Sequence, residues 1–234
     1  MYSAIVFDVN ETLLDLRAME PAFERYFGSG DLRKEWFNEV LKLAFATTVL
    51  GRYYDFGVVG RAALGILEKR HNKSCTERQR NSILSLMREL PAHADVSQAL
   101  ELLKEQGFRL VALTNSTAST AEAQLTHAGI RHLFQQVFSV DTVRRLKPAP
   151  EPYRMVAAQL GADPKSLLMV AAHSWDIAGA IHAGWNGAFV ARPGQVLDAL
   201  TPKPAFMAQD LSDLARMIIR KGSPRREVRV KRAK

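Results

Sequence analysis

Short apolar runs alternate with longer amphipathic stretches along most of the chain, and this alternation limits the possible folds more than any other feature. Each run is bounded by polar or glycine-rich residues, as strands covered on both faces of a sheet should be. Strands that are separated by helices build βαβ units, so the pattern predicts an α/β protein with a parallel sheet. The predicted strands are residues 4–9, 109–114, 136–140, 167–171 and 188–191.

Residues 16–92 interrupt this rhythm with four consecutive helical patterns and no convincing strand. The last pattern opens with Ser74-Cys-Thr-Glu77, which has the spacing of a capping box. We therefore expect a helical cap domain, residues 16–92, inserted into a core domain formed by residues 1–15 and 93–220. The four predicted cap helices are residues 20–27, 32–50, 56–71 and 77–90.

Composition excludes several classes of protein. With 234 residues, 47% of them hydrophobic and 24% charged, the chain is typical of globular domains rather than disordered or fibrous ones. No apolar stretch reaches the roughly 18 residues of a membrane span, and MYSAIVFDVNE does not resemble a signal peptide. The single Cys75 cannot form an internal disulfide. These features predict a cytoplasmic protein that does not associate with membranes.

The positive charge of the chain is concentrated at its C-terminal end. Residues 220–234 contain eight basic side chains and one acidic side chain, which is +7 of the total net charge of +8. We expect residues 221–234 to form a solvated basic tail and the protein not to bind nucleic acid. The alternative is a binding protein without catalytic activity, in which the tail anchors nucleic acid or an anionic surface.

Polar residues follow four of the predicted strands. Asp8 and Thr12 follow the first strand, and Thr114 and Asn115 end the second. Because the carboxyl ends of parallel strands meet at one edge of a sheet, where α/β proteins bind their ligands, we expect one active site there. The further polar residues at this edge are Asp141 and Lys147 after the third strand, and His173 and Asp176 after the fourth.

These segments resemble the four motifs of the haloacid dehalogenase superfamily, over residues 3–218. Within that superfamily, Ser139-Val-Asp141, Lys147-Pro-x-x-x-x-Tyr153 and Trp175-Asp176 are most similar to the type II (L-)2-haloacid dehalogenases. The resemblance implies a Rossmann-like core with an inserted helical cap. It also implies a small-molecule 2-haloacid substrate and, as in similar proteins, a possible homodimer formed through the cap helices.

The resemblance further implies a two-step reaction. The Asp8 carboxylate displaces halide from Cα of an (S)-2-haloacid, and water then hydrolyses the aspartyl ester to release an (R)-2-hydroxyacid. Halide leaves as a stable anion, so this reaction requires no proton donor, no metal and no organic cofactor. Lys147 is expected to offset the charges of Asp8 and Asp176.

The remaining residues of the expected site bind or surround the substrate. Asn115 resembles a residue that lies near the departing halide, and Tyr153 one that contacts the lysine and carboxylate cluster. For Thr114 and Tyr153, simple packing is an equally good interpretation. The expected substrate-binding residues are Asn10, Thr12, Phe37, Thr114, Asn115, Tyr153 and Trp175.

A phosphatase of the same superfamily is the main alternative. Such enzymes use a second aspartate, two residues after the nucleophile, as acid and base, and here that residue is Asn10. They also hold Mg²⁺ with an acidic pair in the fourth motif, because a hard cation needs several oxygen ligands. Asp176 is present, but Ala172 stands where its partner is expected. Both differences disfavour phosphoryl transfer.

Three positions depart from the common dehalogenase pattern. Phe37 stands where many members have an arginine, Ala171 and His173 replace a serine and an asparagine, and Glu11 replaces a glycine. Because the first and fourth strands are neighbours in this fold, Glu11 and His173 could form a dyad that activates water. Phe37 would then form an aromatic wall beside the halide. The alternative is that His173 only binds a loop carbonyl.

Overall fold

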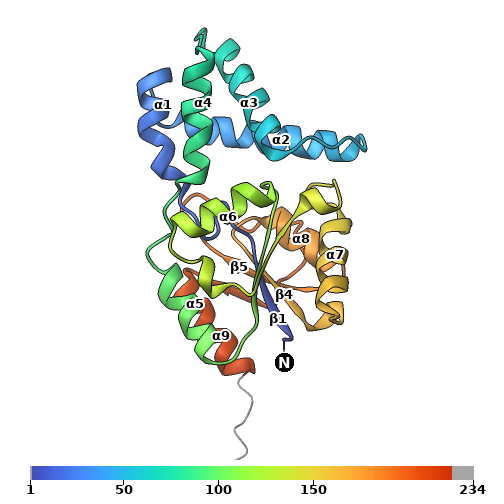
Figure 1. The fold of residues 1–234 in the computed structure, drawn as a ribbon. Coiled ribbons are helices and arrows are strands. Elements are labelled where there is room, and N and C mark those ends of the chain that lie inside the picture. Colours follow the sequence, from blue (N-terminus) through green and yellow to red (C-terminus); the bar gives the residue numbers. More distant parts are fainter. Residues whose placement is uncertain (1, 223–234) are drawn as a thin grey trace, which may run out of the picture.

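The computed structural model describes residues 2–222 and contains one six-stranded parallel sheet with helices on both faces (Figure 1). The strand order is β3-β2-β1-β4-β5-β6. The predicted α/β, Rossmann-like fold class is therefore confirmed. The strands are β1 (Ala4–Phe7), β2 (Leu110–Thr114), β3 (Gln136–Ser139), β4 (Leu167–Ala171), β5 (Asn186–Val190) and β6 (Phe206–Ala208).

Strand β1 lies at the centre of the sheet between β2 and β4. All its residues are buried, which explains why the strand is a continuous apolar run. Strand β6 was missed by the sequence prediction, because three residues with an exposed Met207 at their centre do not form a recognisable run. The first strand also ends two residues earlier than predicted, at Phe7.

Five helices cover the sheet. In Figure 1, α5 and α9 lie together on one side, and α7 and α8 lie on the other. Helix α9 includes residues 221 and 222 of the predicted basic tail, and the rest of that tail lies outside the described residues. The helices are α5 (Val96–Glu105), α6 (Ala118–His127), α7 (Pro150–Leu160), α8 (Ser174–His182) and α9 (Leu211–Gly222).

The other four helices lie over the carboxyl ends of the strands, at the top of Figure 1. Two chain segments connect them to the core side by side, since Asp15 N–H donates to Pro91 O at 2.9 Å and His93 N–H donates to Leu13 O at 2.9 Å. No helix among residues 2–222 is long and apolar enough to cross a membrane. The cap helices are α1 (Glu20–Phe27), α2 (Leu32–Val49), α3 (Phe56–Arg70) and α4 (Glu77–Ser85).

Two details of the last cap helix differ from the prediction. A 3₁₀ turn, Leu86–Arg88, replaces the predicted end of α4. The capping box is present but was placed two residues too early. Thr76, directly before the first helical residue, accepts from Gln79 N–H, and the Gln79 side chain accepts from Thr76 N–H at 2.7 Å. The helix begins at Glu77, so only Thr76 can reach its free N–H groups.

Candidate active site

Strand β1 delivers Asp8 to the carboxyl edge of the sheet, where its carboxylate is almost completely buried. Oδ1 accepts from Lys147 Nζ at 2.8 Å. Oδ2 accepts from Thr12 Oγ1 at 2.7 Å and faces His173 Nδ1 at 3.3 Å. Burial alone would raise the pKa of Asp8, but the Lys147 charge and the His173 contact outweigh it and hold this pKa well below its usual range. Asp8 is therefore an ionised carboxylate.

Lys147 is fully buried and uses all three of its N–H donors. Besides Asp8, they reach Asp176 Oδ2 at 2.5 Å and Leu113 O at 3.0 Å. Burial acts to lower the pKa of Lys147, but the two carboxylates outweigh it and raise this pKa above its ordinary value. Asn115 Oδ1 accepts from the Lys147 backbone N–H at 2.8 Å and so fixes where the lysine leaves the loop.

Asp176 lies in the first turn of α8, and its second oxygen accepts from Tyr153 Oη at 2.6 Å. Burial raises the pKa of Asp176, and the Asp8 charge adds to this effect, while Lys147 and Tyr153 act against it. Gly179 makes the Tyr153 contact possible. A Cβ atom at Gly179 would lie 2.6 Å from Tyr153 Oη and 2.8 Å from Pro148 Cβ, closer than atoms can pack.

Glu11 and His173 meet, as the adjacency of β1 and β4 predicted. His173 Nε2 lies 2.9 Å from Glu11 Oε2. The imidazole is stacked against Trp175, with centroids 5.0 Å apart, and lies 6.3 Å from the ring of Phe37. Burial acts to lower the pKa of His173, but hydrogen bonds to Asp8 and Glu11 outweigh it and raise this pKa to about 9. Within residues 2–222, His173 binds these carboxylates and no loop carbonyl.

Glu11 adopts a left-handed backbone conformation, with φ of 61°. Glycine takes this conformation at no cost, whereas another residue loses on the order of 1 kcal/mol. The Glu11 carboxylate also accepts from Arg33 Nη1 at 3.1 Å and from Gln195 Nε2 at 3.0 Å. Sequence reasoning missed both residues. Arg33 precedes Phe37 by four residues in α2, and this one-turn spacing could have revealed it.

Four of the expected substrate-binding residues are occupied by contacts within the chain: Thr12 binds Asp8, Tyr153 binds Asp176, and Asn10 and Thr114 bind residues after β2. Asn10 donates to Ser116 Oγ at 3.1 Å and accepts from Gln124 Nε2 at 2.9 Å. Thr114 Oγ1 accepts from Ser116 N–H at 3.1 Å. These side chains brace the loop after β2. In contrast, the Asn115 side-chain NH₂ makes no hydrogen bond within residues 2–222 and is a free donor beside the site.

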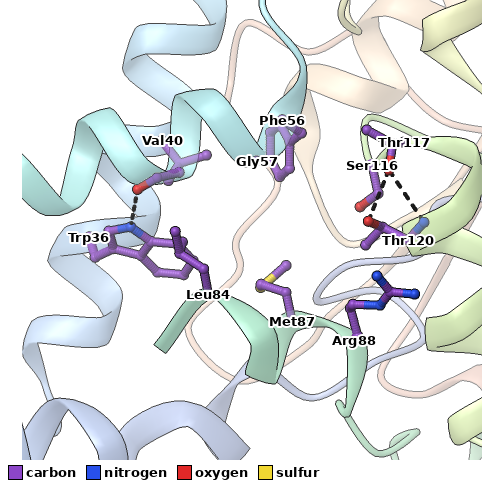
Figure 2. Close-up of a pocket in the computed structure, with 11 residues that line it drawn as sticks. Trp36, Val40, Phe56, Gly57, Leu84, Met87, Arg88, Ser116, Thr117 and Thr120 are labelled. Carbon is purple, nitrogen blue, oxygen red and sulfur yellow. Dashed lines mark hydrogen bonds between the residues drawn. The ribbon is translucent and has the colours of Figure 1, made fainter. Parts of the chain in front are cut away.

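The hollows between the cap and the core include a mainly apolar one and a more polar one. Figure 2 shows the first, a mainly apolar cavity of about 100 Å³ between the cap helices and the start of α6. Trp36, Phe56 and Met87 line it from the cap, and Ser116 and Thr120 line it from the core. The second, about 300 Å³, is bounded by Glu11, Arg33, Phe37, His173, Trp175 and Gln195, among others. His173, which contacts Asp8, thus lies on the wall of this second hollow.

The residues present do not fit the magnesium site of a phosphatase. Both Asp176 oxygens accept from Lys147 or Tyr153, and these donors occupy the positions that a cation would need. Ala172 contributes only a backbone N–H, which donates to Thr12 Oγ1 at 2.9 Å. Among residues 2–222, no three His, Cys, Asp or Glu side chains are arranged to hold a metal ion.

Comparison with known proteins identifies the family of the chain. A profile of the haloacid dehalogenase-like hydrolases matches residues 2–184. The chain belongs to this family. The resemblance stated from the four motifs is thereby confirmed, and the chain is a hydrolase of the α/β type that carries a helical cap.

Several relatives of the chain are named as dehalogenases. The chain is 28% identical to haloacetate dehalogenase H-2 of Moraxella sp. (strain B), over 92% of this chain and 97% of the relative. It is 31% identical to the (S)-2-haloacid dehalogenase of Xanthobacter autotrophicus, over 83% of this chain and 77% of the relative. The structure of L-2-haloacid dehalogenase from Xanthobacter autotrophicus with chloropropionic acid covalently bound has a TM-score of 0.88, at 27% identity, and covers 96% of this chain and 100% of that one.

Proposed function

We propose that this protein is a hydrolytic dehalogenase that converts short (S)-2-haloacids to (R)-2-hydroxyacids and halide through an ester of Asp8. The observation that carries the proposal is the ionised Asp8 carboxylate, held by a buried lysine at the mouth of the sheet. The chain's relatives include (S)-2-haloacid dehalogenases. Neither step needs a metal ion or an organic cofactor.

In the first step, Oδ1 of Asp8 attacks Cα of the substrate from the side opposite the halogen. Oδ1 accepts one hydrogen bond, from Lys147, whereas Oδ2 interacts with both Thr12 and His173. A carboxylate oxygen has two lone pairs, so Oδ1 keeps one for the attack. The new bond joins Oδ1 to Cα, and the halide leaves with the electron pair of the carbon–halogen bond. One displacement inverts Cα.

The substrate carboxylate needs donors, and the free NH₂ group of Asn115 is one. The His173 imidazolium, which is charged below a pH of about 9, uses its two N–H groups for Asp8 and Glu11 and so contributes positive charge but no free donor. Phe37 carries no charge, and the positive groups on this side of the site are His173, Arg33 and Lys34. Phe37 and Trp175 flank the imidazole and form the apolar walls against which the halogen lies.

In the second step, water attacks Cγ of the esterified Asp8. Ester formation removes the Asp8 negative charge that supports the protonated form of His173, so the imidazole releases its Nδ1 proton to solvent and becomes a base. His173 takes a proton from the water, and Glu11 stabilises the resulting imidazolium. Thr12 donates to the oxygen that becomes negative, Oδ2. The Cγ–Oδ1 bond breaks, and Oδ1 leaves in the hydroxyacid product.

The test is halide release from (S)- and (R)-2-chloropropionate with EDTA present, using wild-type protein and Asp8→Asn. We expect release from the (S) enantiomer only, and none from Asp8→Asn. In a single turnover in H₂¹⁸O, the label should enter Asp8 and not the product. Phosphate release from a phosphate monoester that depends on Mg²⁺, without dehalogenation, would instead establish the phosphatase alternative.

The proposed base is tested with His173→Asn, and His182→Asn, an exposed histidine on α8, is the matched control. His173→Asn should still form the ester, which mass spectrometry detects on the peptide containing Asp8, but should hydrolyse it about 10²–10⁴-fold more slowly. His182→Asn should behave as wild type. If no ester accumulates in His173→Asn, the Glu11–His173 dyad is not the hydrolytic base.

We also propose a cytoplasmic location and a homodimer formed through the cap helices. Exposed apolar side chains cluster where α2 ends and α3 begins, which supports such an interface. Val49 is 85% exposed, Leu50 72% and Val58 49%. Sedimentation of the full chain tests the dimer.

Removal of residues 221–234 should leave dehalogenation unchanged, whereas a binding protein that works through its tail would lose its function.

A further inference from the structure

A cap arginine that is 4% exposed reaches across to the core beside the proposed base. Arg33 lies near the start of α2, and its Nη1 donates to Glu11 Oε1 at 3.1 Å. Its Nη2 donates to Glu20 Oε1 at 3.4 Å, so the guanidinium is held from both ends. A buried arginine that binds two carboxylates is fixed in orientation, because its planar fork sets the direction of every donor.

The two carboxylate oxygens of Glu11 have different hydrogen-bond partners. Oε1 accepts from Arg33, whereas Oε2 receives His173 Nε2 at 2.9 Å and Gln195 Nε2 at 3.0 Å. The main chain is fixed as well, since His93 Nε2 lies 3.0 Å from Glu11 O. A glutamate without the Arg33 contact could rotate its carboxylate away from the imidazole. Arg33 therefore holds the Glu11 carboxylate in the orientation in which one of its oxygens faces His173.

We propose that Arg33 is a positioning residue for ester hydrolysis, which holds Glu11 so that it orients His173 as the base. This inference rests on the proposed function. Arg33 belongs to the cap and Glu11 to the core, so the water-activating group is completed by a contact between domains. Displacement of halide uses Asp8 and Lys147, which lie in the core and do not touch Arg33.

The change that tests the inference is Arg33→Met, with Arg33→Lys as the conservative variant. Arg80→Met is the matched control, because Arg80 makes a similar pair with the buried Glu68 at 2.7 Å entirely within the cap. The substrate is (S)-2-chloropropionate. Halide and hydroxyacid are followed separately in the first turnover and at steady state, and the fold of each variant is checked by circular dichroism.

Arg33→Met should release one equivalent of halide rapidly and then turn over about 10- to 100-fold more slowly than wild type, with the ester accumulating on Asp8. kcat and KM should fall together, because slow hydrolysis traps the bound state. Arg33→Lys, which keeps the charge, should recover much of the rate. An arginine that bound the substrate carboxylate would instead raise KM without a burst, and that result would overturn the proposal.

The pH dependence of hydrolysis gives a second readout that a purely structural contact would not change. The charged groups around His173 are Asp8, Glu11, Lys147 and Arg33, and Glu20, Asp15, Arg17 and Arg192 lie beyond them. Without Arg33 the Glu11 carboxylate should turn away from His173, and the pKa of His173 in the ester should fall, since the Glu11 hydrogen bond that raises it is lost. The acid limb of the hydrolysis rate should therefore move to lower pH in Arg33→Met and stay in place in Arg33→Lys.

The outcomes separate this inference from the function on which it rests. If wild type releases no halide, the proposed function fails. If wild type is active but Arg33→Met accumulates no more ester than Arg80→Met, Arg33 has no positioning role. If Arg33→Met does not fold, Arg33→Lys decides: a longer-lived ester together with a wild-type circular dichroism spectrum supports the role, and wild-type hydrolysis refutes it.

Discussion

The floor and the rim of the active site are built in different ways. The floor consists of Asp8, Lys147 and Asp176, which follow core strands and are buried, with Lys147 in contact with both carboxylates. The rim, around Glu11 and His173, takes Arg33 from the cap and Gln195 from the loop after β5. The floor thus depends on sheet topology alone, whereas the rim also depends on how the cap sits on the core.

This difference separates the two steps of the proposed reaction. The floor holds the nucleophile ionised and so serves bond formation at Cα, while the rim serves activation of water. Buried, fully paired charges tolerate little change, because removal of one leaves its partners uncompensated. In the rim, Glu11 and Gln195 are partly accessible, whereas His173 and Arg33 are as buried as Asp8. We therefore expect changes in the floor to affect folding and both steps, and changes in the rim to affect mainly hydrolysis.

The largest effect is expected for Lys147→Met, which removes the positive charge shared by Asp8 and Asp176. Two buried carboxylates would remain without a cation, so unfolding free energy should fall by about 3–5 kcal/mol. Loss of this charge should also slow halide displacement by at least about 10³-fold. Chemical denaturation and single-turnover halide release measure the two effects.

Lys104→Met is the control for that change. Lys104 Nζ donates to His132 O at the protein surface, at 2.8 Å. Its replacement should alter unfolding free energy by no more than about 0.5 kcal/mol. An equally small effect for Lys147→Met would contradict the view that the floor depends on its shared lysine.

A smaller effect is expected from the titration of His173 in the rim. Its pKa is raised from 6.5 to about 9 in the folded protein, so its stabilising contribution is complete below pH 6.5 and is lost as pH rises through 9. Unfolding free energy should therefore decline by roughly 2–3 kcal/mol more in wild type than in His173→Asn between pH 6.5 and pH 9. Urea titrations of both proteins at several pH values measure the difference, and parallel curves would show that the imidazole is not charged in the resting state.

The smallest effect is expected for Gly179→Ala, which tests the packing below the floor. The added methyl group would meet Tyr153 Oη and Pro148, and we expect a loss of about 1–3 kcal/mol in unfolding free energy. Gly65→Ala, in the middle of α3 with open space around its Cβ position, should instead stabilise the protein by about 0.5–1 kcal/mol. Thermal unfolding of both variants shows whether the two glycines differ as the packing requires.

The floor could be predicted from the sequence and most of the rim could not, for a physical reason. Asp8, Lys147 and Asp176 follow from one rule, that parallel strands bring their carboxyl ends together. The Glu11–His173 contact also followed from the order of the strands. Arg33 did not, since its place depends on the packing of a helix against a different domain. Gln195 lies in a loop without periodicity, which has no pattern to interpret.

Errors in the fold have similar causes. Strand β6 is too short to form an apolar run, and the cap of α4 could be placed only after the first helical residue was known. Asn10 was expected at the substrate because of its position beside the nucleophile. Its side chain instead binds Ser116 and Gln124, and Gln124 continues to Met87 O in the cap at 2.7 Å. Position along a loop therefore does not determine the direction of a side chain.

The left-handed backbone at Glu11 bears on how such a catalyst could arise. Two of the four glycine codons differ from a glutamate codon at one nucleotide, so a chain that turns at this point on a glycine could acquire the carboxylate by a single substitution without rebuilding the loop. The conformational penalty would be the main obstacle. If a histidine already stood at position 173 on the adjacent loop, the new glutamate side chain would have a hydrogen-bond partner at once.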